Sequence, residues 1–283
     1  MEYHIDGVHL YGPPCALNVC ATDPVLSYTK IITVFWDGKR GHVRHMADYN
    51  DGYLGIIRRF LKGDDNQLED FINTQRNNPQ NAAVINYITN HNGFTLNDCV
   101  SYDRKHNEAN HENNRDGESF NYSWNCGAEG ETSDPEVLKL RFRMIRNACA
   151  VLMCSRGTPM FLAGDEFGNT QYGNNNGYCQ DNEISWLNWN DLEKNRGLFE
   201  FFKYMIAFRQ EHRVIREKLP DAVCGMDPIH THDTDAERTD IARDAMTFCV
   251  SFAGYDLDKG KDDLVYIAVN TYWEDVRITL PKV

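Results

Sequence analysis

The chain has 283 residues, an apolar fraction of 41% and a formal net charge of −13. That length can bury a large core, enough for one large domain and a small one, and the composition is ordinary for a globular protein. The strong negative charge argues against nucleic acid or an anionic membrane as the main partner. A neutral sugar polymer is compatible with this charge, and so are many other ligands.

No run of residues reaches the roughly 20 apolar positions that cross a bilayer, and the polar residues from Met1 to His9 contain no signal-peptide core. The nine cysteines are an odd and scattered set without a CxxC pair. We interpret them as free thiols in a reducing compartment, because neither a disulfide framework nor a zinc site fits this pattern. These observations predict a cytoplasmic protein that uses no metal or cofactor.

Short strand-like runs alternate with helical runs through the first two thirds of the chain. The expected strands cover residues 30–36, 81–89 and 158–162, and the expected helices cover 51–62, 136–155 and 197–214. The helix over 136–155 follows a capping residue, Ser133 or Asp134, and has Pro135 at its start. Strands and helices that alternate in this way favour a parallel sheet with crossover helices.

After about residue 217 the pattern changes to short strands joined by polar turns. These strands are expected at 245–252, 264–270 and 276–280. Because no helical run lies between them, they predict a small antiparallel sheet. We therefore divide the chain into a large region, 1–219, and a small β domain, 220–283.

The segment 101–133 is polar and far longer than an ordinary connection. It contains four aromatic residues, Tyr102, Phe120, Tyr122 and Trp124. They favour an ordered surface loop over a disordered one. Two histidines and two glutamates in this loop could form a metal site, but the HExxH pattern is absent and polar packing is the favoured interpretation.

Six polar and glycine-rich stretches carry the most specific pattern in the chain. They are NHNGFTLND at 90–98, KHNEAN at 105–110, ENNRDG at 112–117, GTPM at 157–160, AGDEFG at 163–168 and GNNNGYCQDN at 173–182. Stretches of this length, in this order, resemble the glycogen-debranching and isoamylase branch of the α-amylase superfamily. The resemblance runs from residue 3 to the C-terminus and so covers nearly the whole chain.

The resemblance implies a (β/α)8 barrel whose active site lies at the C-terminal ends of the strands. It also implies that this chain begins near the fourth strand. The expected fold class is therefore α/β: a partial TIM barrel of about strands 4–8, followed by the small antiparallel β domain. A partial barrel exposes the edges of its sheet, so we expect either a homo-oligomer that covers the open edge or a rearranged sheet that does not close.

The resemblance places three carboxylates at the strand ends, and this chain has none of them. By position, the family's arginine before the nucleophile is His9 and the nucleophile itself is Tyr11. The general acid falls on Val34, and the third carboxylate, which follows a histidine, falls on Asn92 after His91.

Each replacement removes a part of the chemistry. Retaining glycosidases need two carboxyl groups about 5–5.5 Å apart. Val34 has no proton to donate, and general acid catalysis is worth roughly 10²–10⁴ in rate. Asn92 keeps hydrogen bonds but lacks the negative charge that stabilises an oxocarbenium ion. Tyr11 would need a neighbouring base to act as a nucleophile, and no acid partner is evident close in the sequence.

The candidate glucan-binding residues under this resemblance are His9, Trp36, His91, Asp165 and Tyr178. Trp36 and Tyr178 could stack on sugar rings or pack in the core or at its rim. In the family, the turn with Asp165 and Glu166 is structural or lines the substrate. The run of asparagines at 174–176 could bond sugar hydroxyls or form turns.

Three functions are compatible with these features. The first is a non-catalytic isoamylase-like protein that binds an α-glucan or maltooligosaccharide. The second is an active or split glycosidase that hydrolyses α-1,6 branch points, although an added half would not restore acids at positions that lie in this chain. The third is a structural role, in which two chains complete each other's barrel.

Overall fold

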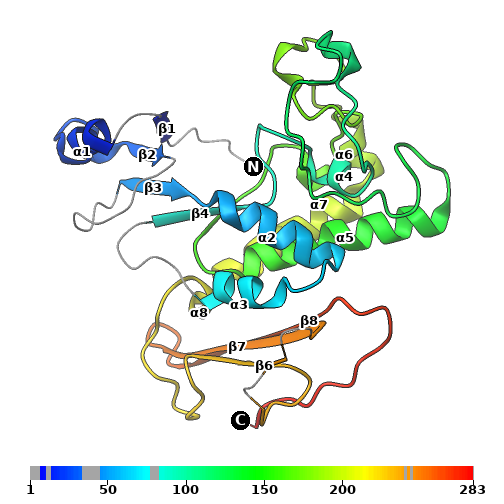
Figure 1. Cartoon of the computed structure of the whole chain (residues 1–283). Coiled ribbons are helices and arrows are strands. Elements are labelled where there is room, and N and C mark those ends of the chain that lie inside the picture. The colour runs from blue at the N-terminus through cyan, green and yellow to red at the C-terminus, as the bar shows by residue number, and fades with distance from the viewer. Residues whose placement is uncertain are drawn as a thin grey trace.

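Two separate sheets organise the chain (Figure 1). The computed structural model describes residues 7–10, 14–33, 45–76, 83–238, 241–242 and 245–282. The first sheet has five strands in the order β1-β2-β3-β4-β5, and the second has three in the order β6-β7-β8. No helix among the described residues is long and apolar enough to cross a membrane.

Every pairing in the first sheet is parallel and joins strands that follow one another along the chain. These strands are β1 (Gly7–Leu10), β2 (Lys30–Thr33), β3 (Met46–Tyr49), β4 (Ala83–Tyr87) and β5 (Thr158–Met160). Consecutive parallel neighbours are the arrangement of a singly wound barrel. Within the described residues, the outer edges of β1 and β5 pair with no further strand.

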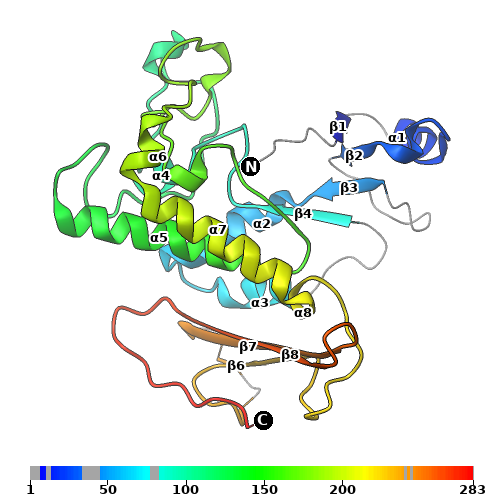
Figure 2. The same ribbon diagram turned by 180° about the vertical axis from the view of Figure 1, so that it is seen from behind.

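Helices fill the connections and lie beside the first sheet. They are α1 (Pro14–Thr22), α2 (Asp51–Lys62), α3 (Leu68–Arg76), α4 (Leu96–Cys99), α5 (Pro135–Cys154), α6 (Asn190–Lys194), α7 (Arg196–Glu211) and α8 (Arg213–Arg216). Figure 2 shows α5 and α7 side by side, with the second sheet below them.

Helix α2 illustrates how the sequence sets these elements. Tyr53, Ile57 and Phe60 recur at helical spacing and are all buried on one face. The helix ends at Gly63, whose φ of 86° allows its N–H to bond the carbonyls of the last turn. Helix α5 begins at Pro135 as expected, because the Asp134 side chain accepts hydrogen bonds from the first turn.

The second sheet is antiparallel and packs on the helical layer. Its strands are β6 (Ile229–His232), β7 (Thr247–Asp256) and β8 (Lys261–Asn270). Phe71 of α3 stacks on Phe60 of α2, with ring centroids 3.9 Å apart, and meets Phe248 of β7 edge-on at 5.4 Å. All three rings are buried, and burying each stabilises the fold by about 1.5–3 kcal/mol.

Three sequence expectations differ from the structure. The strand expected at 276–280 is wrong: the segment is irregular, and Thr279 N–H donates to the Thr234 carbonyl at 2.9 Å. Strands β3 and β6 and helices α1 and α3 were not predicted; for β6, the His-Thr-His run lacks an apolar pattern. The helix expected over 197–214 divides at His212, whose Nδ1 lies 2.6 Å from Asp263 Oδ1 on β8.

Candidate functional site

The carboxyl ends of the parallel strands meet at one edge of the first sheet, where the sequence places its candidate residues. His9 lies in β1, paired with Ile32 of β2. Tyr11, Val34 and Trp36 lie outside the described residues. The structure therefore locates the part of the predicted site that follows β4 and β5.

His91 and Asn92 follow β4 and are both exposed. The backbone N–H of Asn92 donates to Asn90 Oδ1 at 2.8 Å, and Gly93 N–H donates to the Asn175 carbonyl at 3.0 Å. The loop is thus fixed by its own turn and by a distant segment. Its two candidate side chains are open to solvent, where a ligand can reach them.

Asp165, which follows β5, is 1% exposed. Its Oδ1 accepts from Leu96 N–H at 2.8 Å, and its Oδ2 accepts from the Thr89 hydroxyl and from Leu162 N–H at 3.2 Å. Burial raises the pKa of Asp165 to about 7. These bonds tie the ends of β4 and β5 to the start of α4. Direct contact between Asp165 and a sugar stays a prediction, and it would have to replace these bonds.

Glu166 is buried beside Asp165, and its Oε2 accepts from Gly164 N–H at 2.8 Å. A third buried acid, Asp98, accepts from Gln171 N–H at 2.8 Å and from the Thr170 hydroxyl at 2.5 Å. Burial raises the pKa of Asp98 to about 6. Sequence reasoning did not single out Asp98, because Thr170 and Gln171, which donate to its carboxylate, lie more than 70 positions away.

Amide side chains join the loop that contains 105–117 to the loop that contains 173–182. We call this set the asparagine network; it consists of Asn107, Asn110, Asp116, Asn174, Asn175 and Asn176. Asn107 Nδ2 donates to Asn175 Oδ1 and Asn175 N–H donates to Asn107 Oδ1, both at 2.9 Å. Asp116 Oδ2 accepts from Asn110 and Asn176, both at 2.8 Å, and these bonds lower the pKa of Asp116.

The network decides between the two interpretations of the 174–176 run. Asn174 and Asn175 are buried, and their amides bond other residues of the chain. They therefore hold two loops together, and the sugar-contact interpretation does not fit the buried pair. Gly117 completes the packing: its φ is +70°, and a side chain there would overlap the Asn175 amide oxygen.

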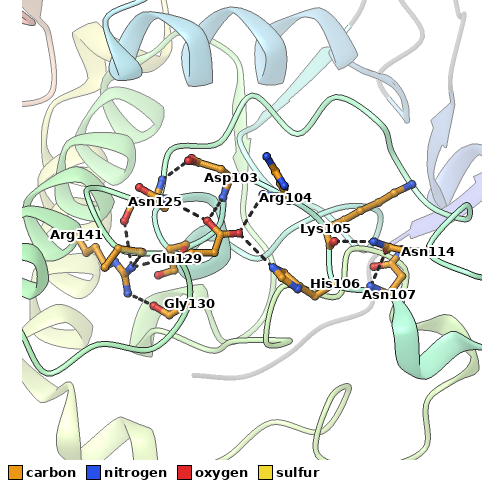
Figure 3. A network of polar contacts seen from close by, with 12 residues as sticks. Asp103, Arg104, Lys105, His106, Asn107, Asn114, Asn125, Glu129, Gly130 and Arg141 are labelled. Carbon is orange, nitrogen blue, oxygen red and sulfur yellow. Dashed lines mark hydrogen bonds and ion pairs between the residues drawn. The ribbon is translucent and has the colours of Figure 1, made fainter.

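A second polar network fixes the segment 125–130 (Figure 3). Glu129 accepts from Asp103 N–H at 2.8 Å, from Asn125 Nδ2 at 3.1 Å and from Arg104 N–H at 3.2 Å. The buried Arg141 of α5 donates to the carbonyls of Gly130 at 2.7 Å and Asn125 at 3.1 Å. The long loop is therefore ordered by specific bonds, as expected for an ordered surface loop.

His106, one of the histidines considered for a metal, points its Nε2 at Glu129 Oε1 at 3.2 Å (Figure 3). The part of the chain that the structure describes contains no group of three or more histidine, cysteine or acidic side chains placed to hold a metal ion. His106 therefore takes part in polar packing through its contact with Glu129.

Tyr178 lies on a single 3₁₀ turn, Gly177–Cys179, and is 81% exposed. Trp186 and Trp189, which follow it in the same segment, are also exposed. The Trp186 indole N–H donates to Asp181 Oδ1 at 3.0 Å, which fixes one edge of its ring. Sequence reasoning missed these two tryptophans, although exposed aromatic residues in a polar segment are a common sign of a binding surface.

Comparison with curated proteins gives several relatives, although no protein-family model matches the chain. The glycogen operon protein GlgX homolog of Mycobacterium tuberculosis is 45% identical over 210 residues, which are 69% of this chain and 29% of that protein. Isoamylase 3, chloroplastic, of Oryza sativa subsp. japonica is 37% identical over 310 residues, 99% of this chain and 38% of the relative.

The chain belongs to the isoamylase and glycogen-debranching branch of the α-amylase superfamily. It spans 29% and 38% of the lengths of these two relatives.

Solved structures agree on the fold. A pullulanase from Paenibacillus barengoltzii in complex with maltohexaose and α-cyclodextrin gives a TM-score of 0.56 at 20% identity, over 84% of this chain and 34% of that one. A pullulanase from Anoxybacillus sp. LM18-11 complexed with maltotetraose gives 0.57 at 17% identity, over 92% and 35%. These likenesses confirm the expected fold class, an α/β partial barrel followed by a small antiparallel sheet.

Proposed function

We propose that this isoamylase-like chain binds α-glucan without hydrolysing it. The observation that carries the proposal is the set of residues at the three positions where the family resemblance places acids: Tyr11, Val34 and Asn92. The double displacement of a retaining glycosidase needs a carboxylate that forms a bond to the sugar and a carboxylic acid that protonates the leaving oxygen. Without both groups the reaction has neither its nucleophile nor its general acid.

The acids that follow β4 and β5 do not substitute for the missing ones. Asp165 and Glu166 are buried, and each already accepts hydrogen bonds from backbone N–H groups. Asp51, which begins α2 after β3, is exposed, and its Oδ1 accepts from the Tyr87 hydroxyl. Asp51 alone therefore does not supply both groups of either a retaining or an inverting mechanism.

Exposed groups after β4 and in the segment 173–182 support binding. The His91 imidazole and the Asn92 amide can both exchange hydrogen bonds with sugar hydroxyls. The exposed ring of Tyr178 offers an apolar face to a sugar. Pullulanases of similar fold have been solved with maltohexaose and maltotetraose, which makes a maltooligosaccharide the first ligand to test.

The decisive experiment measures the reducing ends that the purified chain releases from glycogen and amylopectin. We expect none above the buffer control, together with measurable binding of maltoheptaose by isothermal titration. A triple variant, Tyr11→Asp, Val34→Glu and Asn92→Asp, tests whether the scaffold can still use acids at these positions. Hydrolysis by the wild-type chain that Tyr11→Phe abolishes would overturn the proposal in favour of an active α-1,6-glucosidase.

Two further parts of the proposal concern the state of the protein. The unpaired edges of β1 and β5 among the described strands support a homo-oligomer that covers the open edge, and sedimentation of a compact monomer would contradict it.

All nine cysteines are free thiols, which supports a reducing, cytoplasmic location. Thiol labelling in intact cells, with and without a membrane-permeant reductant, tests this part.

A further inference from the structure

A large groove lies outside the strand-end region, in the helical layer. Its volume is about 910 Å³, and it is bounded by α4, α5, α6 and the segments 130–133 and 168–172. Figures 1 and 2 both show α4 and α6 close together and above α5. None of the loop residues 90–93 that follow β4 lines the groove. Its size matches that of pockets that hold small organic ligands, about 300–1,000 Å³.

One wall of the groove is held rigid by the network around Arg141 and Glu129 (Figure 3). Arg141 donates to the Gly130 carbonyl at 2.7 Å, at the point where the wall begins. Asp134 caps α5 at the other end of this wall, and its N–H donates to Thr132 Oγ1 at 3.1 Å. The wall between these anchors is therefore preorganised, which lowers the entropy cost of binding a ligand against it.

The opposite wall presents Tyr172, whose backbone is left-handed at a φ of 55°. The preceding residues are fixed by the buried Asp98, which accepts from Thr170 and Gln171. Tyr172 N–H then donates to Thr170 Oγ1 at 2.9 Å. A bulky residue rarely adopts this conformation, and such strain concentrates at functional positions. Here it holds a ring that is 42% exposed at the edge of the groove.

The lining of the groove indicates the chemistry of its ligand. Two acidic and two basic side chains, Glu131, Asp191, Arg141 and Lys194, balance one another. Hydroxyl and amide side chains make up much of the rest, among them Ser133 and Asn188, and Tyr172 and Phe142 add aromatic faces. Groups that both donate and accept hydrogen bonds, beside exposed ring faces, suit a neutral polyhydroxylated ring better than a charged or wholly apolar ligand.

We propose that this groove is a second binding site for a short α-glucan chain, independent of the strand-end residues. The proposal shares its ligand class with the proposed function but depends on a different part of the molecule. A chain with two such sites can hold one branched glucan at two places, and the combined affinity then exceeds that of either site alone.

The test is a maltoheptaose titration of the full-length chain, with variants from both walls. Tyr172→Gly removes the ring and keeps a residue that tolerates the left-handed backbone, whereas Tyr172→Phe keeps the ring. Ser133→Trp fills the groove from the opposite wall. We expect Tyr172→Gly and Ser133→Trp to weaken the groove site about tenfold, and Tyr172→Phe to bind like the wild type. Tyr204→Ala, which removes an exposed ring of α7 outside the groove, is the matched control.

Hydrogen–deuterium exchange then locates the ligand. Maltoheptaose should protect the segments 130–133 and 168–173 in the wild type and in a His91→Ala variant, but not in Tyr172→Gly. If His91→Ala alone weakens maltoheptaose binding and the ligand protects neither segment, the groove proposal is wrong and the proposed function still holds. If maltoheptaose protects the segments but the chain also hydrolyses glycogen, the proposed function is wrong and the groove proposal still holds. If maltoheptaose does not bind at all, both are wrong.

Discussion

The asparagine network and the three acid positions are two regions of one scaffold with opposite character. In the network, four asparagines are buried, Asp116 and Asn176 are half-buried, and their side chains bond one another between two loops. At the acid positions the resemblance calls for carboxylates, and the chain has Tyr11, Val34 and Asn92. The groups that build the loops are in place, whereas the proposed function holds that the groups needed to cleave a glycosidic bond are missing.

The difference follows from what each group contributes to the fold. A buried amide or carboxylate that loses its partner leaves the other partner unpaired, at a cost of about 1–3 kcal/mol each. A catalytic carboxylate is open to solvent and often costs stability, so replacing it leaves folding intact or improves it. Asp165 and Asn175 therefore contribute to stability, whereas acids at residues 11, 34 and 92 would, under the proposed function, contribute only to catalysis.

The largest effect that this comparison predicts is that of Asp165→Ala. The substitution leaves the Thr89 hydroxyl and the N–H groups of Leu96 and Leu162 without their acceptor. We expect the free energy of unfolding to fall by about 3–5 kcal/mol in a urea titration. Asp221→Ala, at an exposed loop position, is the control and should change it by less than about 0.5 kcal/mol. Equal effects of the two substitutions would mean that Asp165 does not hold the strand ends.

Gly117→Ala tests the asparagine network, because Gly117 packs directly against Asn107 and Asn175. The new side chain meets the Asn175 amide oxygen, which cannot move away without losing bonds from Asn107 and to Glu118 and Asn121. We expect a loss of about 2–3 kcal/mol, because strain at a positive φ adds to the displacement of a buried group. Gly225→Ala has a φ of +82° with no atom within 4 Å of the added carbon, so it measures the backbone strain alone, about 1 kcal/mol.

If the two glycine variants lose the same free energy of unfolding, the network adjusts to the clash and is not the rigid element that we describe. If Gly117→Ala also leaves maltoheptaose binding unchanged, the network and the binding residues are independent. A parallel loss of binding at unchanged secondary structure would instead show that the network positions the loop of His91 and Asn92, through the bond from Gly93 to Asn175.

The sequence predicted several of the elements that depend on neighbours along the chain. Helices α2 and α5 have the expected bounds to within one residue, because apolar spacing and a cap at Asp134 are local signals. The strand expected at 276–280 was wrong, and β6 was missed, because pairing in a small antiparallel sheet depends on which partner is near. Ile229 of β6 pairs with Phe252, 23 positions away.

In the candidate site, too, features set by local motifs could be predicted, and features set by distant partners could not. The three acid positions are predicted from motifs, each a short run of residues, and stay a prediction. The roles of Asp165 and Asp98 could not, because the partners of their carboxylates lie 69 to 76 positions away, apart from the Leu162 N–H that bonds Asp165. Tyr172 gave no sequence signal either, since its left-handed backbone depends on Asp98 holding the preceding turn.

The last prediction concerns pH and the buried acids. Burial raises the pKa of Asp165 from 3.8 to about 7 and that of Asp98 from 3.8 to about 6. For each acid, at a pH between its unfolded pKa and its raised folded pKa, the folded chain keeps a proton that the unfolded chain has released. Unfolding in this pH range therefore releases protons. The free energy of unfolding therefore falls as pH rises from about 4 to about 7 and is then constant, with a slope of at most about 1.4 kcal/mol per pH unit for each proton.

Urea titrations at pH 5, 6, 7 and 8 measure this dependence, and Asp165→Asn isolates it. The amide has no carboxyl to titrate, so the variant should lose about 2–3 kcal/mol less than the wild type between pH 5 and pH 8. General repulsion in a chain with a net charge of −13 also grows with pH, but it acts almost equally on both proteins and cancels in the difference. Parallel curves for the two proteins would mean that Asp165 is ionised throughout and that its hydrogen bonds compensate for its burial.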